Sequence, residues 1–180
     1  LVPKGQYRDA MNIQISTSEG SDIGAVENVL GNLLLTNGTD PFLIPEQSVC
    51  VGAVADEKND TFYWFTAHAN KDAILKYDRN TGSVSPVLID INKNVLNFNP
   101  LFLITAINVL DDLLLWTDNR SEPKKINIGL CEQGTNANGA WHTRLIVPAR
   151  NITYNAAPDI TEENVTVIKK SPKQKLLLQE

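Results

Sequence analysis

The stretch Thr61-Phe62-Tyr63-Trp64-Phe65-Thr66 has a close counterpart later in the chain, Leu113-Leu114-Leu115-Trp116-Thr117-Asp118. Each is an apolar run that contains a tryptophan and is rich in residues that favour β-strands. A polar turn follows each run, and then a second strand-like run, Ala73–Asp78 in the first case and Lys124–Ile128 in the second. The pattern indicates a repeated β unit.

The spacing between the two copies is constant. Trp116 follows Trp64 by 52 positions, and Ile126 follows Ile74 by the same 52. A period of roughly 40 to 50 residues with several short strands in each unit is typical of β-propeller blades. We therefore expect an all-β fold built of propeller-like repeated antiparallel sheets, a partial β-propeller with an N-terminal arm and an extended C-terminal segment.

Two blades are expected within residues 48–147. The first, at about 48–90, has strands predicted at Val49–Ala55, Thr61–Thr66, Ala73–Tyr77 and Val84–Ile89. The second, at about 101–147, has strands predicted at Leu103–Val109, Leu113–Thr117, Lys124–Ile128 and Thr143–Val147. Pro86 cannot donate to a strand ladder, so the fourth strand of the first blade is expected at an outer edge.

The segments on either side of the blades differ from them. Residues 1–47 read as an arm or hairpin, with a helical turn at Gln6–Met11 and strands at Asn12–Ser16 and Ala25–Leu30. Residues 148–180 read as an extended segment that holds one strand, Val165–Ile168, and leads toward a missing or partner element. Two blades do not close a ring of about four to eight, so further blades are expected from more sequence or from neighbouring subunits.

Composition excludes several classes of function. The 180 residues carry a net charge of −5, and the basic residues form no broad face, which disfavours tight binding of nucleic acid. No run of about 18 apolar residues is present, so we expect no membrane span. The sequence shows no secretory signal and does not begin with Met, and we expect its true N-terminus to lie elsewhere.

The sequence offers little chemistry for a site. His68 and His142 lack neighbours at metal-ligand spacing and are expected to be partly exposed loop residues. Cys50 and Cys131 are expected to be buried free thiols, although a single disulfide stays open. We predict no catalytic, cofactor-binding or metal-binding residue, no cofactor and no enzymatic activity.

Carboxylates gather at the predicted turns: Asp56, Glu57, Asp60, Asp111, Asp112 and Asp118. They could ligate calcium, but Asp is also favoured in turns because it hydrogen-bonds the local backbone, and that interpretation is preferred. Trp64 and Trp116 are interpreted as core anchors rather than stacking platforms. Five Asn-x-Ser/Thr triplets are attributed to chance: Asn37, Asn59, Asn119, Asn151 and Asn164.

An ordered series of motifs resembles the N-terminal region of bacteriophage tail nozzle or muzzle proteins, the tail tubular proteins of short-tailed and crAss-like phages. The series begins with Leu1-Val2-Pro3-Lys4-Gly5-Gln6-Tyr7-Arg8-Asp9-Ala10-Met11-Asn12, then Ser16–Asp22 and Asn28–Asn32. It continues with Leu114–Asn119 and Glu122–Ile128, so the resemblance covers most of the chain. Members of this family run to many hundreds of residues, which this chain does not.

The resemblance implies a structural role in the virion. Family members assemble as homo-oligomeric rings, typically sixfold, below the portal and adaptor proteins, and surround an axial channel through which DNA passes. The family has no catalytic residues to transfer to this sequence. A net acidic balance is compatible with a conduit in which DNA moves without binding tightly.

Two alternatives remain at this point. Leu-Leu-Leu-Trp-Thr-Asp at residues 113–118 is close to the Tyr-Trp-Thr-Asp repeat of extracellular β-propeller binding modules. The sparse cysteines and the single good copy of the motif count against that alternative. A propeller enzyme that uses turn carboxylates and a metal is the third possibility, with Asp118 as the residue to test.

Overall fold

The structure, a computed structural model, describes residues 13–16, 25–28, 31, 44–148 and 157–168. The chain divides into two compact units, Leu1–Leu34 and Leu35–Glu180. In the first unit β1 (Ile13–Ser16) and β2 (Ala25–Asn28) pair as an antiparallel hairpin, as predicted. The helical turn predicted at Gln6–Met11 lies outside the described residues.

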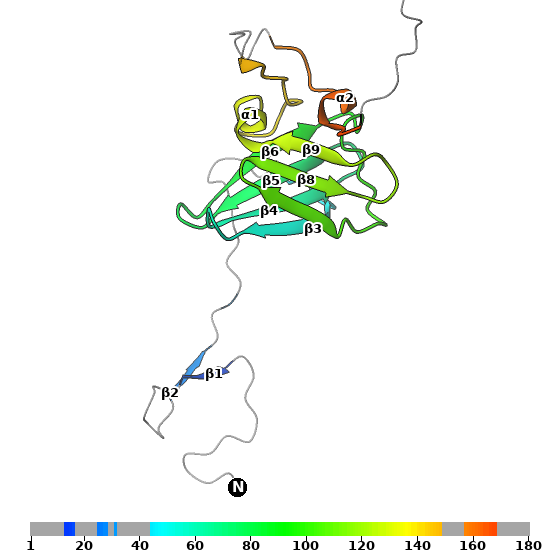
Figure 1. Cartoon of the computed structure of the whole chain (residues 1–180). Helices are drawn as coiled ribbons and strands as arrows, with labels where there is room; N and C mark the ends of the chain where they lie inside the picture. The colour runs from blue at the N-terminus through cyan, green and yellow to red at the C-terminus, as the bar shows by residue number, and fades with distance from the viewer. Residues whose placement is uncertain (1–12, 17–24, 29–30, 32–43, 149–156, 169–180) are drawn as a thin grey trace, which may run out of the picture. The chain divides into compact units, whose positions relative to one another are not determined.

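The second unit consists mostly of β-strands in two antiparallel sheets (Figure 1). Sheet 1 has the order β3 (Val49–Asp56), β4 (Thr61–Ala67), β5 (Asp72–Asp78), β6 (Ser83–Asp90). Sheet 2 has the order β7 (Ala106–Leu110), β8 (Leu113–Thr117), β9 (Lys124–Asn127). Two short helices follow, α1 (Ile128–Gln133) and α2 (Glu162–Val165). Among the described residues, no helix is long and apolar enough to cross a membrane.

The period-2 alternation of the sequence sets which side chains enter the core. Tyr63 and Phe65 of β4 and Leu114 and Trp116 of β8 are buried in one cluster between the two sheets. The Phe65 ring packs edge-on against the Trp116 ring, with centroids 5.3 Å apart. Successive side chains of a strand point to opposite faces, so each sheet turns one apolar face inward and the other outward.

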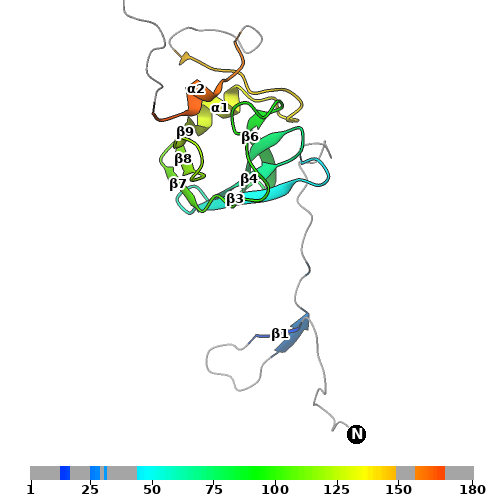
Figure 2. The ribbon, with the colours of Figure 1, turned by 90° about the vertical axis from the view of Figure 1, so that its right-hand side faces the viewer.

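The two sheets are not parallel layers but splay apart like a wedge (Figure 2). They lie closest where β3 and β7 run side by side, and α1 packs against β6 and β9 at the far side of the wedge. Pro86 lies in β6, which is the outer edge strand of sheet 1, as predicted.

A β-bulge in β3 allows the close approach of the two sheets. The pairing of β3 with β4 shifts between Cys50 and Gly52, and the bulged Val51 points into the core. The Val51 carbonyl accepts a hydrogen bond from the Ile104 amide at 2.7 Å. A Cβ at Gly52 would lie 2.8 Å from the Ile104 carbonyl oxygen, so only glycine fits there without a shift of the backbone.

The two tryptophans occupy equivalent positions in their sheets. The bonds from His68 N to Lys71 O and from Ile128 N to Asp112 O fix which pairs of each ladder are hydrogen-bonded. Counting along each register from these bonds, Trp64 with Leu75 and Trp116 with Lys124 are both hydrogen-bonded pairs. At a hydrogen-bonded position, the side chain of an L-residue points to a face set by the direction of its strand and by the side on which the partner strand lies. Both tryptophans lie on the second strand of their sheet and pair with the third, so they lie on equivalent faces.

These equivalent faces point in different directions in the molecule. Trp116 lies on the inner face of sheet 2, whereas Trp64 lies on the outer face of sheet 1, packed against a second cluster that contains Ala73, Leu75 and Val84. The two sheets therefore stack with unlike faces together. This arrangement excludes a two-fold axis between the two sheets, because such an axis would bring like faces together.

The second spacing seen in the sequence is misleading. Ile74 pairs with Phe65 on the inner face of sheet 1, opposite to Trp64, whereas Ile126 shares the face of Trp116. The register partner of Trp64 is Leu75, and that of Trp116 is Lys124. The equal spacing of Ile74 and Ile126 is a coincidence, because the register partner follows Trp116 by 8 positions (124 − 116) and Trp64 by 11 (75 − 64).

The second predicted blade lacks its fourth strand. The chain turns into α1 after β9, because the Asn127 side chain accepts a hydrogen bond from the Leu130 amide and caps the helix. The predicted strand Thr143–Val147 is not a strand, since the Thr143 amide bonds Ile89 of sheet 1 and its carbonyl bonds Ile160. The predicted strand Val165–Ile168 is also wrong, because α2 ends at Val165 and only Thr166 bridges to Lys124 of β9.

Candidate interaction surface

Two fully buried carboxylates lie at the ends of neighbouring strands of sheet 1. Asp72 opens β5, and Asp90, its register partner, closes β6. Asp90 accepts hydrogen bonds from the amides of Asn94, Val95 and Leu96 at 2.7 to 3.2 Å. These bonds fix the connection from β6 to β7, whose apolar side chains enter the core.

Asp72 holds the same connection at a second point. Its Oδ2 accepts the Phe98 amide at 2.7 Å, and its Oδ1 lies 2.9 Å from the Lys93 ammonium, at an angle outside hydrogen-bond geometry. Burial raises the pKa of Asp72, although the ammonium and the amide both favour the ionised form. Lys93 also donates to the carbonyls of His68 and Phe98, so this pair serves the fold.

Of the carboxylates predicted at turns, Asp118 binds the local backbone, whereas Asp56 accepts from the Asn59 side chain, and Asp60 and Asp111 pair with Arg79 and Lys58. Asp118 accepts hydrogen bonds from the amides of Arg120 and Ser121, and Asp78 accepts from the amide of Asn80. Partial burial opposes ionisation of Asp118, but the amides of Ser121 and Arg120, the Ser121 hydroxyl and the Lys124 ammonium together hold the pKa below its usual value. Among the described residues, no cluster of three or more His, Cys, Asp or Glu side chains is placed to hold a metal ion.

The histidines are partly exposed, as predicted. His142 Nδ1 lies 3.4 Å from the Ile91 amide, and its Nε2 lies 3.0 Å from the Ile160 carbonyl. His68 Nδ1 accepts the Asn70 amide at 3.3 Å. Both rings thus have backbone partners.

The cysteines differ from the prediction in one respect. Both are free, but Cys50 is exposed because it precedes the bulge in the edge strand β3, where the alternation of faces is interrupted. Cys131 of α1 is buried in the core, and burial raises the pKa of its thiol to about 12. A thiol that stays protonated is a poor nucleophile.

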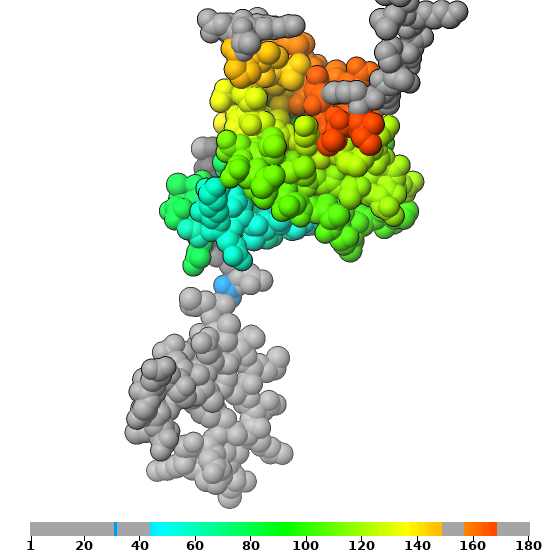
Figure 3. Space-filling view, in the orientation of Figure 1, coloured from blue at the N-terminus to red at the C-terminus, as the bar shows by residue number. Residues whose placement is uncertain are grey.

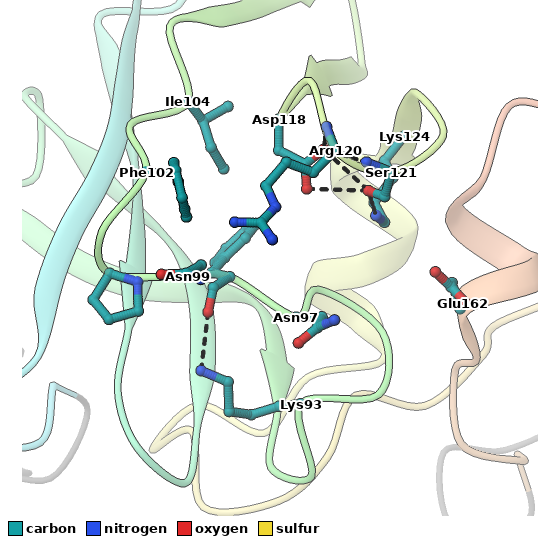
Figure 4. A pocket seen from close by; sticks show the side chains of 12 residues that line it. Lys93, Asn97, Asn99, Phe102, Ile104, Asp118, Arg120, Ser121, Lys124 and Glu162 are labelled. Atoms are coloured by element: carbon teal, nitrogen blue, oxygen red, sulfur yellow. Dashed lines mark hydrogen bonds between the residues drawn. The ribbon is translucent and has the colours of Figure 1, made fainter.

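A pocket of about 460 Å³ lies between the β6–β7 connection and the β8–β9 turn (Figure 4). Arg120 reaches into it, with its guanidinium carbon 4.3 Å from the centre of the Phe102 ring. The buried Lys124 ammonium lies 2.5 Å from Ser121 Oγ, which also contacts Asp118. The described residues that line this pocket include no Cys and no His.

Sheet 2 lies on the side of this unit that faces the viewer in Figure 3, and its outer face carries several apolar side chains. Leu110 is 59% exposed at the end of β7, and Leu113 and Leu115 of β8 are half-buried on the same outer face. Leu101, Phe102 and Leu103 of the segment before β7 are also exposed, but they lie outside the strands that form this face. A strand face with so much apolar surface is the best candidate for a functional surface of this unit.

Sequence reasoning did not find this surface. It located the strands, but it could not tell which face of each strand is covered. The alternation of Leu113, Leu114 and Leu115 carries no such signal, because all three residues are leucine. The buried Asp72 and Asp90 were also missed, since nothing in the sequence distinguishes them from turn carboxylates.

Comparison of the chain with protein-family models, with curated protein sequences and with solved structures finds no significant match. The function must therefore be inferred from the residues and the geometry described above.

Proposed function

We propose that this chain is a structural protein of a bacteriophage tail, the N-terminal part of a nozzle or muzzle ring. In this proposal the two sheets act as successive blades of a propeller-like repeat, and the protein resides in the virion. Its role is mechanical: it connects upper tail parts to the distal tip and forms part of the conduit through which DNA is ejected.

The observation that carries the proposal is the stacking of the two sheets with unlike faces together. Blades of a propeller stack in this way, with their inner strands close and their outer strands spread apart. The wedge that opens from β3 and β7 toward β6 and β9 supports the same arrangement. The ordered motifs that resemble nozzle proteins then favour a tail ring over other uses of such sheets.

The arrangement of polar groups agrees with a structural role. The buried Asp72 and Asp90 hold the β6–β7 connection, and Asp118 binds the backbone of its own turn. The partners expected for such a protein are further copies of itself in a ring, with sixfold symmetry favoured, and adaptor or portal proteins. DNA would pass transiently without a specific binding site.

Electron microscopy of the particle that contains this chain tests the proposal. Class averages along the symmetry axis should show rings with a central hole at the tail, and an antibody against this chain should label that ring. A monomer without symmetry, with glycans at exposed Asn59 or Asn119, would contradict the proposal and favour an extracellular binding propeller.

A further inference from the structure

Each sheet leaves one apolar strip uncovered near the strands where the sheets meet. The back strip lies on the outer face of sheet 2, and its members are Ala106, Asn108, Leu110, Leu113, Leu115 and Thr117. The front strip lies on the outer face of sheet 1, and its members are Ala53, Ala55, Phe62 and Trp64. Neither strip contains a charged residue, although the exposed Lys125 of β9, the register partner of Leu115, borders the back strip on the same face.

The front strip corresponds to a surface that is buried elsewhere in the same molecule. Trp64 is the equivalent of Trp116, and the face of Trp116 packs on the inner face of sheet 1. The back strip is, in turn, the sheet 2 equivalent of that inner face, which carries Tyr63 and Phe65. Inside the molecule, the Trp116 face of sheet 2 packs on the Phe65 face of sheet 1. The two faces that stay free are the equivalents of these: the Trp64 face of sheet 1 and the Leu115 face of sheet 2.

We propose that copies of this chain associate head to tail, with the back strip of one copy packed on the front strip of the next. Sheet 2 of one copy would then pack on sheet 1 of the next copy in the same way that sheet 1 packs on sheet 2 within one copy. This inference rests on the blade-like stacking in the proposed function, and it names the surfaces that would build the ring.

The shapes of the two strips suit each other. The front strip presents the Phe62 ring, which is 41% exposed, beside the half-buried Trp64, with ring centroids 6.0 Å apart. The back strip contains a shallow depression of about 330 Å³ whose lining includes Ala106, Asn108, Leu115, Thr117 and Pro123. An aromatic side chain would fill it, as Phe65 and Trp116 fill the interface inside the molecule.

The mode of association follows from the two different surfaces. A contact between unlike patches is heterologous, so it produces a closed ring or an open filament and not a two-fold dimer. A two-fold dimer would require one strip to pack on its own copy.

Complementary variants of the full chain test the proposal by sedimentation velocity. The wild type should form oligomers that grow with concentration, whereas Phe62→Lys on the front strip and Leu110→Lys on the back strip should each weaken association at least tenfold. An equimolar mixture of the two variants should form dimers and nothing larger. In that mixture the intact front strip of Leu110→Lys meets the intact back strip of Phe62→Lys.

Two further variants serve as controls. Leu101→Lys replaces a side chain that is 84% exposed and lies outside both strips, so it should assemble as the wild type does. Asn108→Lys charges the centre of the back strip without removing an apolar side chain, and it should behave like Leu110→Lys. Far-ultraviolet circular dichroism of each variant verifies that the fold is retained.

The proposal would be overturned by a wild-type chain that stays monomeric, by variants that still assemble, or by a mixture that stays monomeric. These outcomes differ from failure of the proposed function. Rings at a phage tail that persist with Leu110→Lys would exclude this interface and leave the tail role intact. Conversely, association through the two strips in a protein that is not part of a phage tail would support this interface and exclude the proposed function.

Discussion

Trp116 is the residue through which sheet 2 joins the core. Its ring is almost fully buried and packs edge-on against Phe65, whereas Trp64 lies half-buried on the outer face of sheet 1. The sequence predicted both tryptophans as core anchors, and the prediction is confirmed for Trp116. Trp64 instead packs half-buried against the second cluster on the outer face, because alternation separates the two faces of a strand without showing how completely each is covered.

This difference predicts unequal costs of truncation. Trp116→Ala should lower the free energy of unfolding by roughly 3 to 5 kcal/mol, because it leaves a cavity in the shared core. Trp64→Ala should cost about half as much or less, since part of its surface is already in water. Urea unfolding of the two variants checks this, and a loss under about 1 kcal/mol for Trp116→Ala would show that the core does not depend on this ring.

Asp118 provides a residue-scale prediction about pH. Its folded pKa is lowered, so the stabilisation from its charge is complete above the ordinary carboxyl pKa of about 4 and is lost as pH falls through the folded value. Asp118→Asn keeps an acceptor for the amides of Arg120 and Ser121 but removes the charge. We expect it to lower the free energy of unfolding by about 1 kcal/mol at pH 7.

The difference between wild type and Asp118→Asn should shrink as the solution is acidified below pH 4. Asp72, whose burial raises its pKa and whose effect on stability has the opposite sign, is present in both proteins and cancels in the comparison. Denaturant unfolding at a series of pH values provides the measurement. A gap that stays constant down to pH 2 would mean that the Asp118 charge contributes nothing.

At the scale of elements, the seven strands of sheets 1 and 2 follow the predicted runs, because alternation and turn residues are local signals. Helix α1 was missed, although Asn127 is a good N-cap residue and Gly134 follows its end. Six residues are too few to show a helical period. Thr143–Val147 has strand-like composition, but its main-chain partners come from Ile89 and residues 158–160, and sequence reasoning could not place those neighbours.

The bulge at Gly52 predicts a strong dependence on one missing methyl group. An added Cβ would lie 2.7 Å from Ile107 Cδ1 and 2.8 Å from the Ile104 carbonyl oxygen, and the main chain cannot yield cheaply. Gly52→Ala should therefore cost roughly 1 to 3 kcal/mol of stability. Gly129→Ala, in α1, is the matched control.

A Cβ at Gly129 would have no neighbour closer than 3.7 Å, and alanine favours a helix over glycine by up to about 1 kcal/mol. Gly129→Ala should therefore be neutral or stabilising in the same thermal or denaturant unfolding experiment. Equal midpoints for the two alanine variants would show that the approach of Ile104 to β3 is looser than described.

At the scale of the whole molecule, the two sheets, α1 and the segment around Ile160 and Val165 share one hydrophobic cluster. A shared core predicts that these parts unfold together and not sheet by sheet. The sequence indicated two separate blades, each with its own four strands. The structure instead replaces the missing fourth strand of sheet 2 with a helix that fills the wedge and ties the sheets together.

The two cysteines test this cooperativity, because only one of them is accessible. Cys50 is exposed and should react with a thiol reagent at once, whereas Cys131 is buried in the shared core with its pKa raised to about 12. Cys50→Ser should therefore leave a protein without a rapidly reacting thiol.

The slow labelling of Cys131 in this variant measures the free energy of the opening that exposes it. If the unit unfolds as a whole, that free energy should equal the value from urea unfolding, within about 0.5 kcal/mol. A clearly smaller value would mean that α1 leaves the wedge on its own, so that the sheets are held together mainly by β3, β7 and the Phe65–Trp116 contact.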